Sequence, residues 1–169
     1  MNFMKRVIIG LLILAAALAA CPHAAAHIRI GQPEVLKGLE AVRLEVERIK
    51  PEIERDGLFR EELQSDIELR LRLAGIRVLS EEEAQKNPGA PLLHLNVDAL
   101  KCSFGYVYNI GLYLIEQATL ARRPLKAPAM FLRIPEQLGI ASRLSEIRDA
   151  VGDVVDEFVK IWKASNSKQ

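Results

Sequence analysis

The chain has 169 residues, of which 50% are hydrophobic and 27% are charged, with 23 Lys and Arg against 22 Asp and Glu. This length fits one globular domain, and the apolar content excludes an intrinsically disordered chain. A formal net charge of +1 excludes the strongly basic surface of an unspecific nucleic-acid binder, and 5% aromatic residues argue against stacking platforms for single strands.

The N-terminus has the pattern of a secretory signal peptide. Lys5 and Arg6 form a short positive region, and residues 7–20 follow without a polar side chain. A helix of residues 7–20 spans roughly 21 Å at about 1.5 Å per residue, short of the ~30 Å hydrocarbon core, so a transmembrane anchor is the poorer interpretation. No later stretch is apolar enough to span a bilayer. We therefore expect an extracytoplasmic protein of the periplasm.

Two cleavage sites are compatible with the end of this segment. The sequence Leu-Ala-Ala-Cys at residues 18–21 resembles the bacterial lipobox, which makes Cys21 a candidate for lipidation and residues 1–20 the signal. Ordinary cleavage after Ala26 is the alternative, because Pro22 would end the apolar helix just before a small-residue site. The protein is then either membrane-anchored through Cys21 or soluble, and Cys102 has no partner for a disulfide.

Hydrophobic periodicity predicts a single α/β domain over residues 40–165, after an irregular segment at residues 27–39 and before a tail at residues 166–169. Strict alternation predicts a half-buried strand at residues 40–48. Beyond Lys50 and Pro51, a charged turn leads to a helix entry at Asp56 and Gly57. The further predicted elements, in order, are a helix at residues 58–74, a strand at residues 76–79, a short helix with a capping box from Ser80 to Glu83, a loop at residues 87–91 and an alternating strand at residues 92–100.

The second half of the chain predicts a longer strand pair and a closing helix. Residues 101–105 indicate a hairpin into a strand at residues 106–119, where Gly111 marks a bend or bulge. A basic, proline-interrupted loop at residues 122–128 precedes a strand at residues 129–134 that stops at Pro135. An amphipathic helix then starts near Ser142.

This order of elements predicts a two-layer α/β (α+β) sandwich. Its sheet is mixed, with the long helix after the first strand and the C-terminal amphipathic helix on one face. The other face carries polar side chains that are partly solvated.

No standard catalytic or cofactor motif occurs: CxxC, HExxH, the P-loop, GxGxxG and GxSxG are all absent from the sequence. An N-terminal His27 could chelate copper with His94 as a further ligand. However, an N-terminal histidine is more often a chance product of the cleavage site, so we predict no metal, no cofactor and no catalytic residues.

The candidate binding residues lie on one predicted strand and in one loop. His94, Asn96 and Asp98 share a strand face as a polar patch, for which a hydrated sheet face is the simpler interpretation. Arg122 and Arg123 belong to the predicted basic loop. A tyrosine of residues 106–119 that is exposed beside His94 would suit a protein contact, although packing in the core is the simpler interpretation.

The sequence Gly-Ile-Arg-Val-Leu at residues 75–79 follows a predicted helix and precedes the alternating strand after Pro91. This arrangement of elements resembles a known group of domains, the small envelope domains of bacteria, namely the N-terminal domain of the Tol-system propeller protein and the curli-secretion-channel lipoprotein family. Over roughly residues 40–120, the resemblance implies an extracytoplasmic α/β docking or assembly module without catalytic residues to carry over.

We therefore expect a non-catalytic binding or assembly module of the bacterial envelope, with another envelope protein as its partner and no role for nucleic acid. The alternative is a small-ligand-binding or enzymatic domain that uses the polar sheet face around His94. The oligomeric state does not follow from the sequence.

Overall fold

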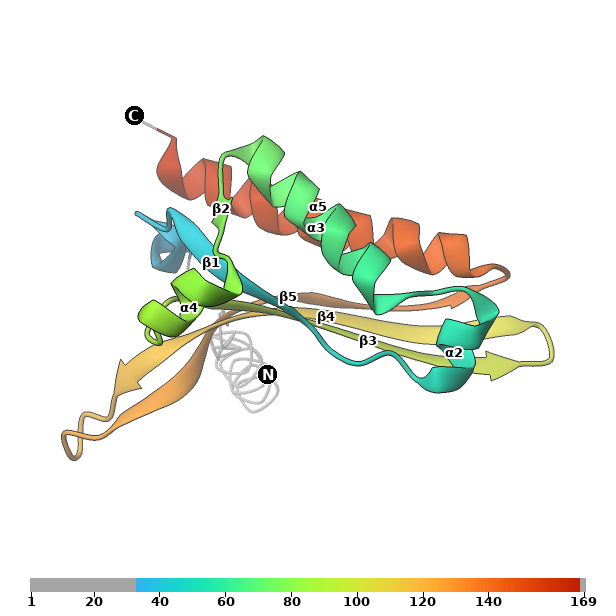
Figure 1. Cartoon of the computed structure of the whole chain (residues 1–169), viewed down its shortest axis with the longest axis horizontal. Coiled ribbons are helices and arrows are strands. Elements are labelled where there is room, and N and C mark those ends of the chain that lie inside the picture. The colour runs from blue at the N-terminus through green and yellow to red at the C-terminus, as the bar shows by residue number, and fades with distance from the viewer. Residues whose placement is uncertain (1–32, 168–169) are drawn as a thin grey trace, which may run out of the picture.

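A computed structural model describes residues 33–167, which fold into one mixed sheet covered by helices on one face (Figure 1). Cys21, His27 and the predicted signal segment lie outside the described residues. The five strands described are β1 (Ala41–Val46), β2 (Arg77–Val78), β3 (Leu92–Cys102), β4 (Gly105–Thr119) and β5 (Lys126–Ala141). The helical elements are the 3-10 turn η1 (Pro33–Leu36) and the α-helices α2 (Pro51–Asp56), α3 (Arg60–Ala74), α4 (Glu81–Lys86) and α5 (Leu144–Asn166).

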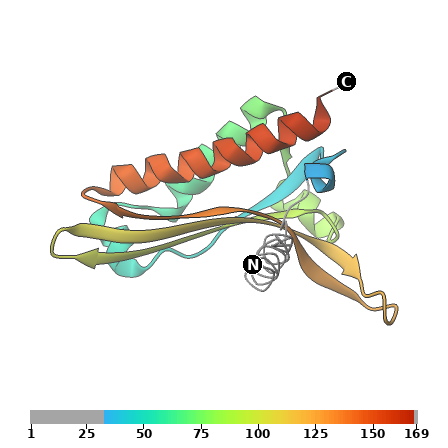
Figure 2. The same cartoon turned by 180° about the vertical axis from the view of Figure 1, so that it is seen from behind.

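The strands are arranged in the order β2-β1-β3-β4-β5. β1 is parallel to both β2 and β3, whereas β3, β4 and β5 form an antiparallel meander. Helices α3 and α5 cover one face of this sheet side by side (Figures 1 and 2). The predicted two-layer sandwich, with both long helices on one face, is therefore confirmed.

The periodicity of the long elements explains this arrangement. Along β3, Leu93, Leu95, Val97 and Ala99 are buried beneath the helices, and the residues between them point to the open face. The buried side of α5 includes Ile147, Val151, Val155 and Phe158, spaced three or four residues apart. Both stripes belong to the one buried hydrophobic cluster that forms the core.

The region between β1 and α3 differs from the prediction. Residues 51–56 are the helix α2 rather than a turn, with Pro51 at its first position, where a missing N–H costs nothing. Asp56 is the last residue of α2, and Gly57 ends it at a φ of 113°. Asp56 and Gly57 therefore end a helix instead of starting one, and α3 begins only at Arg60.

The prediction for the last strand was also wrong. β5 continues through both Pro128 and Pro135, because it is an edge strand and can tolerate residues without an N–H. The pairing of β4 with β5 shifts register between Ile110 and Leu112 and between Leu114 and Ile115. At each shift the extra residue belongs to β5, so Gly111 lies opposite a bulge rather than in one.

The β4–β5 hairpin extends beyond the rest of the sheet as a projecting arm (Figures 1 and 2). β3 begins at Leu92, which pairs with Ile115. The arm pairs beyond this point, from Glu116 with Ala129 to Thr119 with Lys126, therefore have no third strand beside them in the described part of the chain. Residues 120–125 form the turn at the tip. The turn therefore ends at Leu125, earlier than the predicted loop at residues 122–128, because β5 begins at Lys126.

The end of α5 is joined to the start of the described chain. Trp162 Nε1 donates to Leu39 O at 2.7 Å, and Asn166 Nδ2 donates to Leu36 O at 2.8 Å. Gly38 N donates to Asn166 Oδ1 at 2.8 Å, and Leu36 is fully buried. Leu36 therefore belongs to the core, and the segment before β1 is held against the last turns of α5.

Candidate functional site

The open face of the sheet, opposite α3 and α5, carries the three residues singled out on β3. His94 and Asn96 converge on one carboxylate, that of Glu47, just after β1. Asn96 Nδ2 donates to Glu47 Oε2 at 2.5 Å, and His94 Nε2 lies 3.6 Å from the same oxygen. Asp98 does not join them, because it pairs with Lys50 Nζ at 2.6 Å. The predicted patch is therefore divided into two groups, one around the Glu47 carboxylate and the other formed by the Lys50–Asp98 ion pair.

The polar contacts continue across the sheet through Tyr113 on β4. Its ring stacks on His94 with centroids 6.3 Å apart and an interplanar angle of 27°. Tyr113 OH donates to Glu136 Oε1 at 3.0 Å, and Arg133 forms an ion pair with that same oxygen. We call Glu47, His94, Asn96, Tyr113, Arg133 and Glu136 the polar network.

Tyr113 is held as a hydrogen-bond donor by its surroundings. Burial raises the pKa of the Tyr113 hydroxyl above its ordinary value, and the hydrogen bond to Glu136 adds to this rise. The ring lies directly over Gly111, since a Cβ at that residue would approach Tyr113 Oη to 2.2 Å. The missing side chain at Gly111 thus lets Tyr113 lie flat along β4.

An apolar strip lies on the same face, next to the β3–β4 turn. The cross-strand register aligns Leu100 of β3, Val107 of β4 and Ile140 of β5, and Leu138 is two residues from Ile140 on the same strand face. Three of these side chains are strongly exposed: Leu100 is 61% exposed, Ile140 68% and Leu138 75%. We call Leu100, Val107, Leu138 and Ile140 the apolar strip. Neighbouring exposed apolar side chains of this size mark interaction surfaces.

Sequence reasoning anticipated only part of this face. A tyrosine beside His94 was one of two alternatives, with packing in the core as the simpler one, and the half-buried Tyr113 lies there. Glu47, Arg133 and Glu136 were missed because their proximity depends on the register between strands, which no single strand encodes. The apolar strip had a detectable signal, since Leu138 and Ile140 are apolar residues at alternate positions, but β5 was predicted to end before them.

The remaining predicted residues lie elsewhere. Arg122 and Arg123 are exposed in the turn at the tip of the projecting arm. Cys102 is a free thiol whose Sγ donates to Gly105 O at 3.3 Å within the β3–β4 hairpin. Residues 33–167 contain no group of three or more potential metal-ligating side chains, and the predicted His27 ligand lies outside this range.

Comparison with known proteins gives no relative for this chain. No family model, no curated protein and no solved structure matches it. The resemblance to Tol and curli-channel domains therefore stays a prediction. None of the helices described is both long and apolar enough to cross a membrane.

Proposed function

We propose that this protein is a non-catalytic binding module of the bacterial cell envelope, which docks a partner protein on the open face of its sheet. The observation that carries this proposal is the presence of the apolar strip and the polar network on one uncovered face. Protein interfaces combine an apolar centre with a polar rim in this way. The expected resemblance to envelope assembly domains agrees with such a role.

The contacts within the polar network favour recognition over catalysis. Glu47 is engaged by Asn96 and His94, and Glu136 is engaged by Tyr113 and Arg133. Side chains that fix each other in this way present a rigid pattern of donors and acceptors to a partner. A small-ligand or enzymatic site around His94 is the alternative function.

The envelope location rests on the apolar N-terminal segment. We propose that this segment directs export and is then removed, either as residues 1–20 by cleavage before Cys21 or as residues 1–26 by cleavage after Ala26. Intact-mass analysis of the protein from separated membrane and soluble envelope fractions tests this. A diacylated Cys21 would establish a lipoprotein, an N-terminus at His27 would establish a soluble periplasmic protein, and an uncleaved cytoplasmic chain would refute the location.

Site-specific photocrosslinking in cells tests the docking face. A photoreactive amino acid at position 138 should crosslink a discrete partner. The same group at position 73 on α3, which is also highly exposed, should not. The double variant Leu138→Lys and Ile140→Lys should abolish the crosslink formed from position 100. Equal crosslinking from positions 138 and 73 would contradict the proposal.

A second variant separates the two candidate functions. Replacement of His94, Asn96 and Asp98 together by Ala should weaken the partner crosslink only moderately, because the apolar strip remains. If purified protein instead converts or binds a small molecule, and the triple variant loses this with unchanged thermal stability, the alternative function replaces the proposed one.

A further inference from the structure

The outer edge of β1 is covered by a neighbouring strand over only part of its length. Pairing with β2 is limited to Ala41 with Arg77 and Val42 with Val78, and Leu79 N donates the last hydrogen bond, to Val42 O at 2.9 Å. β1 itself continues to Val46. Beyond Val42 this edge therefore has no strand partner within the described residues.

Alternate residues of β1 direct their backbone groups to this open edge. Arg43 N and Glu47 N donate to carbonyls on the β3 side, at 2.8 Å each. The N–H and C=O groups of Leu44 and Val46 consequently point the other way. Of these groups, Val46 O is occupied, because Arg60 Nε donates a hydrogen bond to it at 2.6 Å. The backbone of Leu44 is left available to an added strand.

A groove of about 560 Å³ runs along the same edge. α3 contributes one wall and α4 with its preceding residues contributes the other, on either side of β2 (Figure 1). Leu44, Leu79 and Leu92 supply apolar lining, and Ala84 leaves the α4 side uncrowded. This volume lies within the usual range for ligand sites, and the exposed strand edge suits an extended chain.

Two arginines of the groove lack a carboxylate partner. Arg43 Nε is buried without a hydrogen-bond partner, and neither Arg43 nor Arg60 forms an ion pair with residues 33–167. Arg72, in contrast, pairs with Glu68 at 3.0 Å. Glu45 and Glu81 also line the groove without an ion pair to residues 33–167, but both are exposed, whereas Arg43 and Arg60 are half-buried. Unpaired guanidinium groups favour an anionic ligand, above all a carboxylate.

We propose that this groove binds an extended peptide segment with an acidic side chain. The segment continues the sheet where β2 ends, pairs with the backbone of Leu44, and places its carboxylate against Arg43. The chain's own N-terminal residues 1–32 contain no Asp or Glu, so the acidic segment belongs to another protein. The groove shares no residue with the polar network or the apolar strip, so this proposal does not rest on the proposed function.

Titration of the isotope-labelled protein with designed peptides, followed by NMR, tests the proposal. The probe is an end-capped hexapeptide that alternates valine and aspartate, and its controls carry lysine for aspartate or N-methylated backbone amides. We expect the acidic peptide to shift the Leu44 and Val46 amide resonances saturably. Its Kd should be at least about tenfold lower than those of both controls. No saturable shift at these amides, or equal binding of the lysine peptide, would overturn the proposal.

Two groove variants and one matched control complete the test. Arg43→Gln should weaken binding of the acidic peptide about tenfold, with little change in Tm because Arg43 Nε has no protein partner to lose. Ala84→Trp should block the groove without touching Arg43. Arg55→Gln removes the same charge from α2, outside the groove, and should leave the Kd within about twofold. Equal losses for Arg43→Gln and Arg55→Gln would reduce the effect to general charge attraction and refute the site.

Discussion

At the residue scale, Gly111 controls how Tyr113 lies on the open face. In Gly111→Ala the added methyl would overlap the Tyr113 hydroxyl, so the ring must leave its position against His94 and Glu136. We expect the pKa of Tyr113 to fall toward its ordinary value, because both the burial and the Glu136 hydrogen bond that raise it are lost. Tyrosine ring carbon NMR across the alkaline range measures this.

Glu136→Gln is the companion variant for the Tyr113 prediction. It keeps the ring in place but removes the acceptor charge, so the pKa of Tyr113 should fall less than in Gly111→Ala, since burial is the larger cause. A Tyr113 pKa unchanged by both substitutions would show that the ring does not occupy the described position.

Gly105 is the glycine whose backbone conformation the β3–β4 hairpin requires. Its φ is +132°, and a Cβ there would lie 2.2 Å from Ala141 O, a backbone atom that cannot move aside cheaply. Gly105→Ala should therefore lower the free energy of unfolding by about 1–3 kcal/mol. Gly89→Ala is the matched control, since its nearest neighbour would be 3.9 Å away. Urea denaturation with equal midpoints for the two variants would contradict this.

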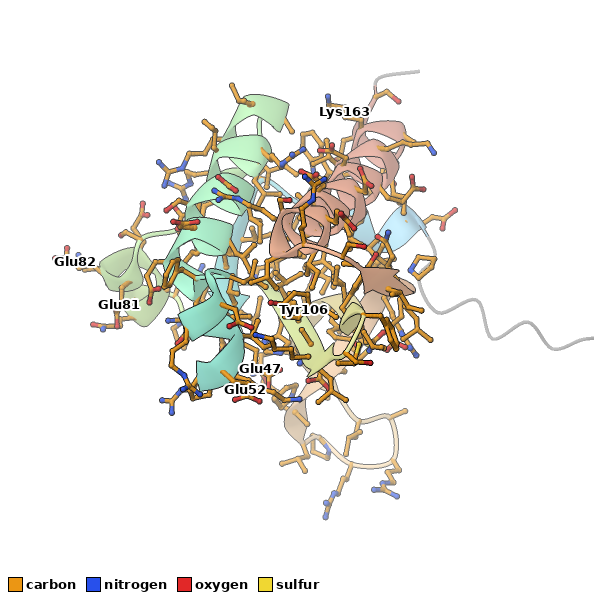
Figure 3. All side chains as sticks on the ribbon, turned by 90° about the vertical axis from the view of Figure 1, so that its right-hand side faces the viewer. Glu47, Glu52, Glu81, Glu82, Tyr106 and Lys163 are labelled. Atoms are coloured by element: carbon orange, nitrogen blue, oxygen red, sulfur yellow. The ribbon has the colours of Figure 1, made fainter. Side chains whose placement is uncertain are left out.

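At the element scale, Asp56 connects the end of α2 to the β3–β4 hairpin. Its carboxylate accepts hydrogen bonds from Lys101 Nζ and Tyr106 OH, both at 2.8 Å, and Tyr106 lies at this end of the sheet in Figure 3. These bonds hold the pKa of Asp56 below its ordinary value, with the hydrogen bond from Lys101 as the largest cause. Ionised Asp56 therefore stabilises the fold above the unfolded-state pKa, and this contribution is lost as the pH falls through the folded-state pKa.

Asp56→Asn should therefore reduce the acid sensitivity of the protein. The variant should be less stable than the parent near neutral pH, and the difference in Tm should shrink from about pH 5 to about pH 3 as the parent loses its ionised carboxylate. Thermal unfolding followed by circular dichroism across this range measures it. Glu52→Gln removes a charge from the same helix and should leave the acid limb unchanged, so parallel behaviour of both variants would exclude a specific role for Asp56.

The predictability of each element follows from how local its signal is. β3 and α5 could be predicted because their apolar residues repeat at the period of a strand and of a helix. α2 was missed because it has only six residues and begins at Pro51, which also reads as a stop signal. β5 was cut short at Pro135 because tolerance of proline depends on the edge position of the strand. His94 and Tyr113 could be proposed as neighbours, but the contacts with Glu47 and Glu136 depend on register.

At the scale of the whole molecule, the two proposed binding surfaces use different parts of one sheet. The apolar strip extends from β3 to the β5 edge, whereas the groove lies beside the outer edge of β1. Leu92, which lines the groove, begins β3, whereas Leu100 of the strip lies near the other end of that strand, so one protein could bind a folded partner and an acidic segment at the same time. Loss of one interaction should leave the other intact, which makes the two proposals independently testable.

The two ends of the described chain stabilise each other through Asn166. Its side chain bonds to both Gly38 N and Leu36 O, which ties the last turn of α5 to the segment before β1. Asn166→Ala removes both long-range bonds and should lower the free energy of unfolding by about 1–3 kcal/mol. Amide hydrogen exchange should become faster at Gly38 and stay unchanged in β3 and β4, because the lost contacts are confined to this junction.

Lys163→Ala is the control for the Asn166 prediction, because Lys163 is exposed on the preceding turn of α5 (Figure 3). It should leave the protection of the Gly38 amide unchanged. If Asn166→Ala instead accelerates exchange equally throughout the sheet, the junction belongs to the global folding unit. If neither substitution changes protection at Gly38, the Asn166 bonds do not hold the N-terminal segment, and the packing of Leu36 and Leu39 in the core must account for its position.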